Sequence, residues 1–257
     1  MIALTDTHCH IHFSDYPLDV SEVLASAHTA GVDRMFCVGC TLADSKQAVI
    51  FAERHKNIWA SIGLHPHESS EYVHDDHALQ QFRELAIHPK VVAIGETGLD
   101  YHYNHSSKVD QKKLLRFQLE LGQEHNLPFI FHVREAFEDF WQIIDSYRGI
   151  RGVVHSFSSD MADVEQVLSR GLYVGLNGIM TFTKEPEQLE AAKRVPKDKL
   201  LLETDAPFLT PKPFRGKVCE PKHVRNTAEF LAELRGESIE ELARNTTSNA
   251  QKLFNLL

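Results

Sequence analysis

The chain has 257 residues, 42% of them hydrophobic and 25% charged, which is the composition of a soluble globular protein with a sizeable core. It carries 27 basic against 36 acidic residues, a formal net charge of -9, and this balance excludes a protein that coats duplex nucleic acid by electrostatics alone. A nucleic-acid substrate would therefore need a local positive site, such as bound metal ions.

The distribution of apolar residues and cysteines predicts a cytoplasmic protein. No stretch approaches the roughly 18 uninterrupted apolar residues of a membrane span, and no basic and apolar leader precedes the first strand pattern. Four cysteines (Cys9, Cys37, Cys40 and Cys219) are too few and too scattered for a disulfide framework. Cys37 and Cys40 form a C-x-x-C without a second pair to complete a zinc site, which favours a buried strand there.

Short apolar runs rich in Val, Ile and Leu alternate along the chain with longer amphipathic stretches. The runs predict eight strands, at residues 2–8, 34–39, 58–65, 91–97, 128–133, 152–157, 172–178 and 200–205. Stretches such as DVSEVLASAHTAG and DQKKLLRFQLELGQEHN carry apolar residues at helical spacing and end at Gly or Asn. The closing segment ESIEELARNTTSNAQKLFNLL is expected to form an additional helical pair packed on the outside.

Eight strand-helix repeats without a linker predict one domain over residues 1–257, an α/β fold of the (β/α)8 TIM barrel type with extra C-terminal helices. A doubly wound open sheet is the alternative architecture. It usually has fewer strands and often a glycine-rich phosphate turn after the first, and DTHCHIHF is no such turn.

Metal-type side chains recur where the predicted strands end, and active sites of such barrels lie at the carboxyl ends of the strands. In DTHCHIH, Asp6, His8 and His10 occupy every second position, so they share one strand face. Together with the later strands, this gives six candidate metal ligands: His8, His10, Glu96, His132, His155 and Asp205. Burying so many polar groups together without a cation would be costly.

Six ligands with nitrogen and oxygen donors exceed what one tetrahedral ion needs, so two divalent ions are expected. Glu96 is the candidate bridging and catalytic carboxylate, with His8 and His10 on one metal and His132 and His155 on the other. The ions are expected to be Mg, Mn or Zn, because imidazoles favour the transition metals while carboxylates and phosphate also admit Mg.

Further residues near the predicted mouth are candidates for catalysis or substrate binding. Asp205 can hold a metal and accept a proton from the attacking water, while Glu203, one layer deeper, either orients a ligand or pairs with a buried cation. Arg134 shares the ligand face of His132 and could clamp a phosphate, although an exposed rim arginine without a role fits equally well. His65 in GLHPH is a candidate contact to a substrate oxygen or a turn residue. Arg215 lies in a long loop that supplies positive charge or is simply solvated.

With their neighbours, these residues resemble the TatD family of metal-dependent deoxyribonucleases, within the amidohydrolase superfamily of TIM barrels. The resemblance runs through DTHCH, GLHPH, AIGETGLDY, LPFIFHVREA, GVVHSF, LLLETDAPFLTP, RGKVCEP and NAQKLF. It implies hydrolysis of nucleic-acid phosphodiesters, commonly as an exonuclease on DNA, with divalent metals at the six ligand positions named above. Two positions depart from the family pattern: Ser156 replaces a frequent cysteine, and Phe214 stands where a histidine or tyrosine often precedes RG.

The function expected from these observations is a two-metal phosphodiesterase, a DNase acting on single strands or strand ends, with no obligatory protein partner. The alternative is an amidohydrolase-type hydrolase or deaminase acting on a C–N or C–O bond of a small molecule, because the same barrel and ligands can polarise a carbonyl or amidine. A non-catalytic metal-binding protein is disfavoured because the ligand set and a base are all present.

Overall fold

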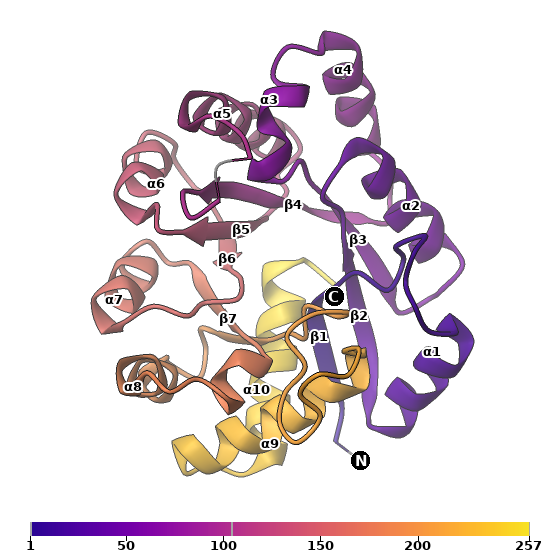
Figure 1. The fold of residues 1–257 in the computed structure, drawn as a ribbon, viewed down its shortest axis with the longest axis vertical. Helices are drawn as coiled ribbons and strands as arrows, with labels where there is room; N and C mark the ends of the chain where they lie inside the picture. The colour runs from indigo at the N-terminus through magenta and orange to yellow at the C-terminus, as the bar shows by residue number, and fades with distance from the viewer. Residues whose placement is uncertain (1, 104, 257) are drawn as a thin grey trace. The chain divides into compact units, whose positions relative to one another are not determined.

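The computed structural model describes residues 2–103 and 105–256 (Figure 1). These residues form eight strands, which follow one another in the sheet in the order of the sequence. The strands are β1 (Leu4–Cys9), β2 (Val32–Val38), β3 (Ile58–Ile62), β4 (Val91–Asp100), β5 (Phe129–Arg134), β6 (Gly152–Val154), β7 (Tyr173–Leu176) and β8 (Leu200–Leu202). The α-helices are α1 (Val20–Thr29), α2 (Leu42–Glu53), α3 (Ser69–Tyr72), α4 (Asp76–Leu85), α5 (Lys108–Glu124), α6 (Phe137–Ile144), α7 (Met161–Ser169), α8 (Pro186–Arg194), α9 (Val224–Arg235) and α10 (Ile239–Leu253).

The first and last strands are also neighbours. The backbone N–H of Asp205 donates to the carbonyl of His8 (2.8 Å), and the N–H of His10 donates to the carbonyl of Ala206 (2.7 Å). Sequential parallel strands with helices between them, and pairing of the first strand with the segment after the last, define the predicted (β/α)8 barrel, which is confirmed.

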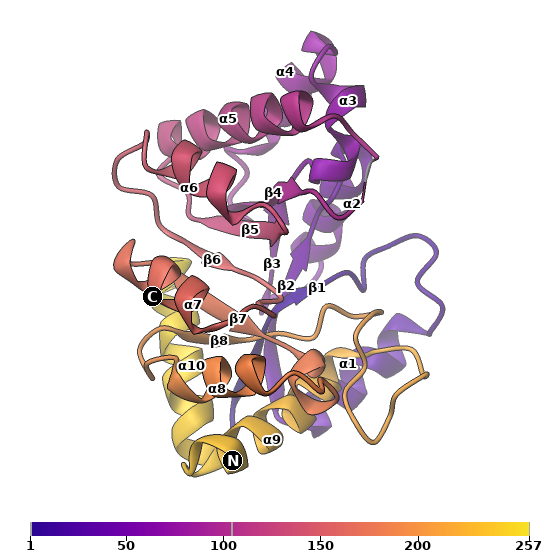
Figure 2. The same cartoon turned by 60° about the vertical axis from the view of Figure 1, so that its left-hand side comes forward.

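The chain divides into two compact units. The first unit comprises the residues up to Phe36 and those from His155 onward, and the second unit comprises Cys37–Val154. In the second unit, α5 packs against β4 and α6 against β5 (Figure 2). The inward face of α5 buries Leu114, Leu115 and Leu119, so this amphipathic helix is held by apolar burial.

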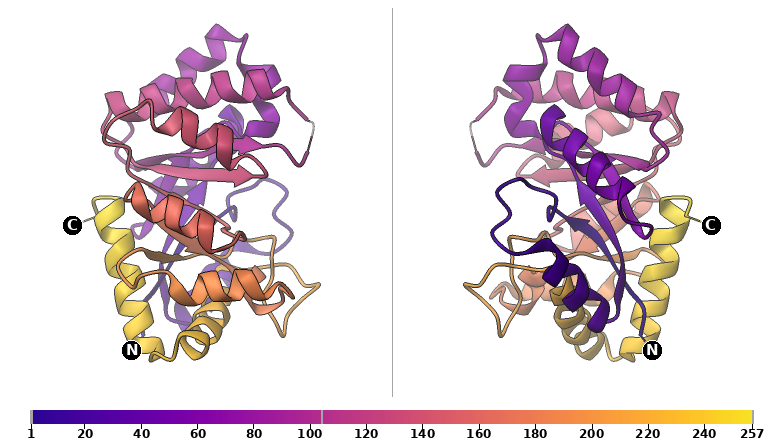
Figure 3. Two further views of the ribbon diagram at one scale, coloured as in Figure 1. Left: turned by 90° about the vertical axis from the view of Figure 1, so that its left-hand side faces the viewer. Right: turned by 90° about the vertical axis from the view of Figure 1, so that its right-hand side faces the viewer.

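In the first unit, α10 packs against β1 and β8 and lies beside α9 (Figure 3). The predicted pair of helices in the closing segment is wrong in detail, because the described part of that segment, residues 237–256, contains α10 alone and α9 precedes it. Gly236 ends α9 in the left-handed conformation (φ 66°), and Ser238 caps α10 by accepting the N–H of Glu241. Leu242, with other apolar residues of α10, is buried.

The strand ends differ from those predicted at positions that matter for the site. Strand β4 runs on to Asp100, so Glu96 lies within it, whereas β6 and β8 end early and His155 and Asp205 follow them. Cys37 is buried in β2 as expected, but Cys40 lies beyond the end of that strand. None of the helices in the described part of the chain has the length and apolar character needed to span a bilayer.

Candidate metal centre

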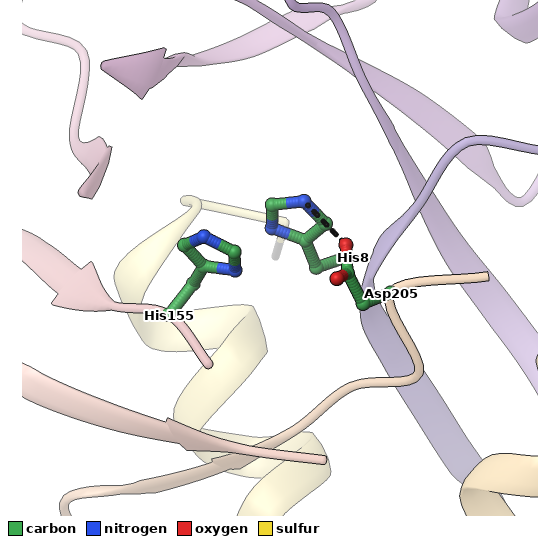
Figure 4. Close-up of side chains that lie close together, drawn as sticks. All are labelled: His8, His155 and Asp205. Atoms are coloured by element: carbon green, nitrogen blue, oxygen red, sulfur yellow. Dashed lines mark ion pairs between the residues drawn. The ribbon is translucent and has the colours of Figure 1, made fainter. Parts of the chain in front are cut away.

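Four of the predicted ligands gather in the first unit: His8 in β1, His10 directly after it, His155 after β6 and Asp205 after β8. Figure 4 shows three of them, with His155 beside the ring of His8 and Asp205 paired with His8. Oδ1 of Asp205 lies 3.4 Å from Nε2 of His8 and 3.3 Å from Nε2 of His10, and the two Nε2 atoms are 3.1 Å apart. The ring of His155 stacks on that of His8 with centroids 4.1 Å apart.

Backbone pairing holds this group in place. Asp6 does not join the ligands as strand alternation suggested; its carboxylate accepts the backbone N–H (2.9 Å) and the hydroxyl (2.6 Å) of Thr204. These bonds tie β1 to the segment after β8, one residue before Asp205. Asp205 itself has a φ of 63°, a left-handed conformation that Asp and Asn tolerate better than most residues and that directs its side chain to the histidines.

The charge state of Asp205 is set by opposing effects. Burial raises the pKa of this carboxyl, but the hydrogen bond from His10 and the nearby imidazoles of His8 and His155 outweigh it, and the net pKa is lowered. Asp205 is therefore a carboxylate at neutral pH, able to bind a cation or accept a proton.

Glu203 is buried (1% exposed) behind the ligands of the first unit. Its Oε1 accepts the backbone N–H of Ser156 (2.5 Å) and a longer bond from the amide of Asn177 (3.4 Å), and it lies 3.8 Å from Nδ1 of His155. Because Glu203 holds the residue that follows His155, it positions that histidine through the backbone. The orienting role of Glu203 and its alternative, pairing with a buried cation, stay predictions from the sequence.

The second unit contains the other two predicted ligands together with His65. Oε1 of Glu96 lies 2.8 Å from Nδ1 of His132 and 3.4 Å from Nε2 of His65. Each of the three offers a donor atom within 4.8 Å of the others. Gly63 allows this approach, because a Cβ at that position would lie 2.1 Å from the backbone nitrogen of Glu96.

The tautomer of His65 follows from its hydrogen bonds. Its Nδ1 accepts the backbone N–H of His67 (3.2 Å), so the proton of the neutral ring lies on Nε2, directed at Glu96. Burial lowers the pKa of His65 to about 4 despite the carboxylate of Glu96, so the ring is neutral at pH 7. His65 is thus a hydrogen-bond donor toward Glu96, which suits the predicted contact to a substrate oxygen better than a role as ligand.

Asp100 and His67 belong to this group and were missed by the sequence analysis. Oδ2 of Asp100, which is 1% exposed, accepts hydrogen bonds from Nε2 of His132 (2.9 Å) and Nε2 of His67 (3.1 Å). Burial raises the pKa of Asp100, but the bonds from His132, Tyr103 and His67 outweigh it and hold the pKa well below its ordinary value. Asp100 lies four residues after Glu96, on the same strand face, so the alternation that singled out His8 could have found it.

Cys40 also contacts this group. Its thiol lies 3.8 Å from Oε2 of Glu96, and the backbone N–H of Glu96 donates to the carbonyl of Gly39 (2.9 Å). The predicted buried-strand role of Cys40 is wrong, because β2 ends at Val38 and the following turn carries Cys40 to the carboxylate.

The predicted substrate-binding arginines lie at the surface. Arg134, at the end of β5, is exposed and places its guanidinium 4.9 Å from the ring centroid of Tyr103. Arg215 is exposed, lies over the ring of Phe182 (3.7 Å) and donates to the carbonyl of Thr210 (3.2 Å). Phe214, the departure from the family pattern, packs beside the ring of His223.

The donor atoms fit divalent cations. Ligands about 2.1 Å from an ion, at angles of roughly 90 to 109°, lie about 3.0 to 3.4 Å apart, and the atoms of His8, His10 and Asp205 are separated by 3.1 to 3.4 Å. In the second unit, carboxylates face both ring nitrogens of His132, at 2.8 and 2.9 Å, although a neutral imidazole has one N–H. Either a second proton or a cation at Nδ1 must balance the carboxylate of Glu96.

Comparisons with known proteins agree with this chemistry. A family model described as TatD related DNase matches residues 5–255. The uncharacterized metal-dependent hydrolase YabD of Bacillus subtilis (strain 168) is 39% identical over 255 residues, covering 98% of this chain and 99% of that protein. The 3'-5' ssDNA/RNA exonuclease TatD of Citrobacter rodentium (strain ICC168) is 34% identical over 250 residues, 95% of this chain and 94% of its own.

A solved structure is similar over the same range. The crystal structure of YJJV, a TatD homolog from Escherichia coli K12, has a TM-score of 0.92 and 30% sequence identity, covering 99% of both chains. The similarity therefore includes the segments that carry all six predicted ligands.

Proposed function

Since the chain belongs to the TatD family of metal-dependent hydrolases, we propose that it hydrolyses phosphodiester bonds of nucleic acids, as a DNase acting on single strands or strand ends. One observation carries the proposal: each unit gathers imidazoles and a carboxylate with their donor atoms at ligand spacing. The printed names of some relatives, 3'-5' ssDNA/RNA exonuclease TatD, support a nucleic-acid substrate.

We assign the metal ligands by unit. His8, His10 and Asp205 would hold one divalent ion, and Glu96 with His132 would hold a second. Ions at these sites would supply Lewis-acid stabilisation of the phosphoryl charge and lower the pKa of a water molecule. Bridging of the ions by Glu96, and the pairing of His132 with His155 on one ion, stay predictions from the sequence.

The chain's own residues move the proton and orient the ligands. Asp205, kept ionised by the surrounding imidazoles, accepts the proton of the attacking water. Asp100 accepts a hydrogen bond from Nε2–H of His132, which keeps the proton of the neutral ring on Nε2 and leaves the lone pair of Nδ1 facing Glu96. His65 donates from Nε2 to Glu96 or, when substrate is present, to a phosphate oxygen. Arg134, exposed at the end of β5, binds a further phosphate of the nucleic-acid substrate.

Degradation of end-labelled single-stranded DNA by purified protein tests the proposal, with Mg, Mn or Zn added back after chelation. We expect a metal-dependent ladder that Asp205→Asn abolishes and that Asp198→Asn, a change of an exposed carboxylate, preserves. Absence of cleavage with every metal, in folded and metal-loaded protein, would contradict the nuclease proposal. Faster turnover of lactones, amides or nucleobases than of oligonucleotides would favour the small-molecule hydrolase instead.

A further inference from the structure

Two exposed aromatic rings lie next to the candidate ligands. Six large apolar or aromatic side chains in the described part of the chain are markedly exposed: Leu18, Ile50, Ile87, Tyr103, Val109 and Phe208. The two that carry rings are Phe208 (54% exposed) and Tyr103 (44%), and each belongs to a different unit. An aromatic ring facing water is a platform on which a flat ligand can stack.

Phe208 is fixed to the ligand group of the first unit. Its backbone N–H donates to the carbonyl of Asp205 (2.8 Å), and its ring centroid lies 6.4 Å from that of His10. The backbone of Phe208 is thus tied to one candidate ligand and its ring lies near another, while the residue is 54% exposed to water. A group bound to an ion at His10 and Asp205 could extend a flat substituent onto this ring.

Tyr103 has the corresponding place in the second unit. Its backbone N–H donates to Oδ1 of Asp100 (3.1 Å), the carboxylate that holds His132. The rings of His67 and Tyr103 meet edge to face with centroids 5.5 Å apart, and Arg134 lies 4.9 Å from the centroid of Tyr103. A ring, a cation and a candidate ligand group therefore lie together, as needed to bind a base, its phosphate and the scissile bond.

We propose that Phe208 and Tyr103 each stack on an unpaired nucleobase of the substrate, so that the enzyme selects single-stranded nucleic acid by its exposed bases rather than by phosphate alone. This proposal rests on the proposed function and names the feature of the substrate that each ring recognises. A ring stacks on every base, so the selection would be tolerant of sequence. A base paired in a duplex presents no free face to either ring.

The experiment compares a short single strand that carries bases with the same strand built from abasic sugars. Dissociation constants are measured by fluorescence anisotropy on phosphorothioate-linked strands, which resist hydrolysis, and kcat and KM on the natural linkages, all with metal-loaded full-length protein. The variants are Phe208→Ala, Phe208→Leu, Phe208→Trp and Tyr103→Ala. Ile87→Ala removes a side chain that is 72% exposed and is the matched control.

We expect wild-type protein to bind the base-bearing strand more tightly than the abasic strand. Stacking on one ring corresponds to roughly 5- to 150-fold in affinity, so Phe208→Ala and Tyr103→Ala should each reduce the preference by a factor in this range. The loss should appear in KM more than in kcat. Phe208→Leu should behave like the alanine variant because it lacks a ring, whereas Phe208→Trp and Ile87→Ala should keep the wild-type preference.

Equal affinity of wild-type protein for both strands, or an unchanged preference in Phe208→Ala and Tyr103→Ala, would overturn the stacking proposal and leave the nuclease proposal intact. If wild-type protein cleaves neither strand but keeps the ring-dependent preference in binding, stacking stands and the nuclease proposal is wrong. If it binds neither strand, both are wrong.

Discussion

Replacing Asp100 by asparagine tests how the second unit prepares His132 for a metal ion. The carboxylate of Asp100 accepts four hydrogen bonds from described residues: Oδ2 from Nε2 of His132 (2.9 Å) and of His67 (3.1 Å), and Oδ1 from the backbone N–H groups of His102 (3.0 Å) and Tyr103 (3.1 Å). An asparagine has the same shape, but one of its two terminal groups is an NH2 that only donates. Whichever way the amide is turned, two of the four donors lose their acceptor.

The size of the effect on stability and on metal affinity depends on which two hydrogen bonds of Asp100 are lost. A buried donor without an acceptor costs about 1 to 3 kcal/mol, so Asp100→Asn should lower the free energy of unfolding by about 2 kcal/mol or more. If the NH2 faces His132, that ring can adapt by moving its proton to Nδ1, 2.8 Å from Glu96. The proton then occupies the lone pair that an ion would use. Loss of such a supporting carboxylate lowers metal affinity about 10- to 100-fold.

The assay is a metal titration by calorimetry, together with urea unfolding of the metal-free protein. Asp198→Asn, a change of the same chemistry at an exposed position, is the control and should leave both measurements at wild-type values. Wild-type metal affinity in a folded Asp100→Asn protein would refute the orienting role of Asp100. Reduced stability with unchanged metal affinity would show that Asp100 stabilises the loop at His102 and does not orient His132.

Three further predictions concern single residues of the two groups. Asp205→Asn should lower turnover about 100-fold or more while melting near the wild-type temperature, because asparagine accepts the left-handed φ of 63° but cannot take a proton; comparable turnover would exclude Asp205 as the base. Gly63→Ala should weaken metal binding and destabilise the protein by about 1 to 3 kcal/mol, since its Cβ would lie 2.1 Å from the backbone of Glu96; a calorimetric titration at wild-type affinity would contradict this. The pKa of His65 is lowered to about 4 in the folded protein, so the unfolded chain binds a proton at this ring more readily. The free energy of unfolding of metal-free protein should therefore keep its full value above pH 6.5 and fall by about 3 kcal/mol on account of His65 as the pH drops toward 4. Urea unfolding between pH 7 and 4 should show a shallower pH dependence for His65→Gln, and an identical slope would count against the shifted pKa.

The fold class and the residue types of the site could be predicted from the sequence. The alternation of short apolar runs with amphipathic stretches predicts the barrel, because the spacing of apolar residues along the chain distinguishes strands from helices. The spacing of His8 and His10 likewise directs both imidazoles to one side of the chain at the end of β1, and their Nε2 atoms lie 3.1 Å apart. Local patterns of this kind depend on backbone geometry over a few residues, so a single sequence contains them.

The hydrogen-bond partners of each side chain could not be predicted from the sequence, because they depend on which strands and turns pack together. Asp6 shares the alternation of His8 yet turns to Thr204, a residue 198 positions away, because that backbone N–H needs an acceptor. Cys40 contacts Glu96 because the turn after β2 passes β4. Asp100 accepts a hydrogen bond from His132 because β4 and β5 pair side by side. Hydrogen bonds and charges act over a few ångströms in space, whereas the sequence records neighbours along the chain. The type of each ligand is therefore encoded locally, while its tautomer, charge state and orientation arise from the strands packed beside it.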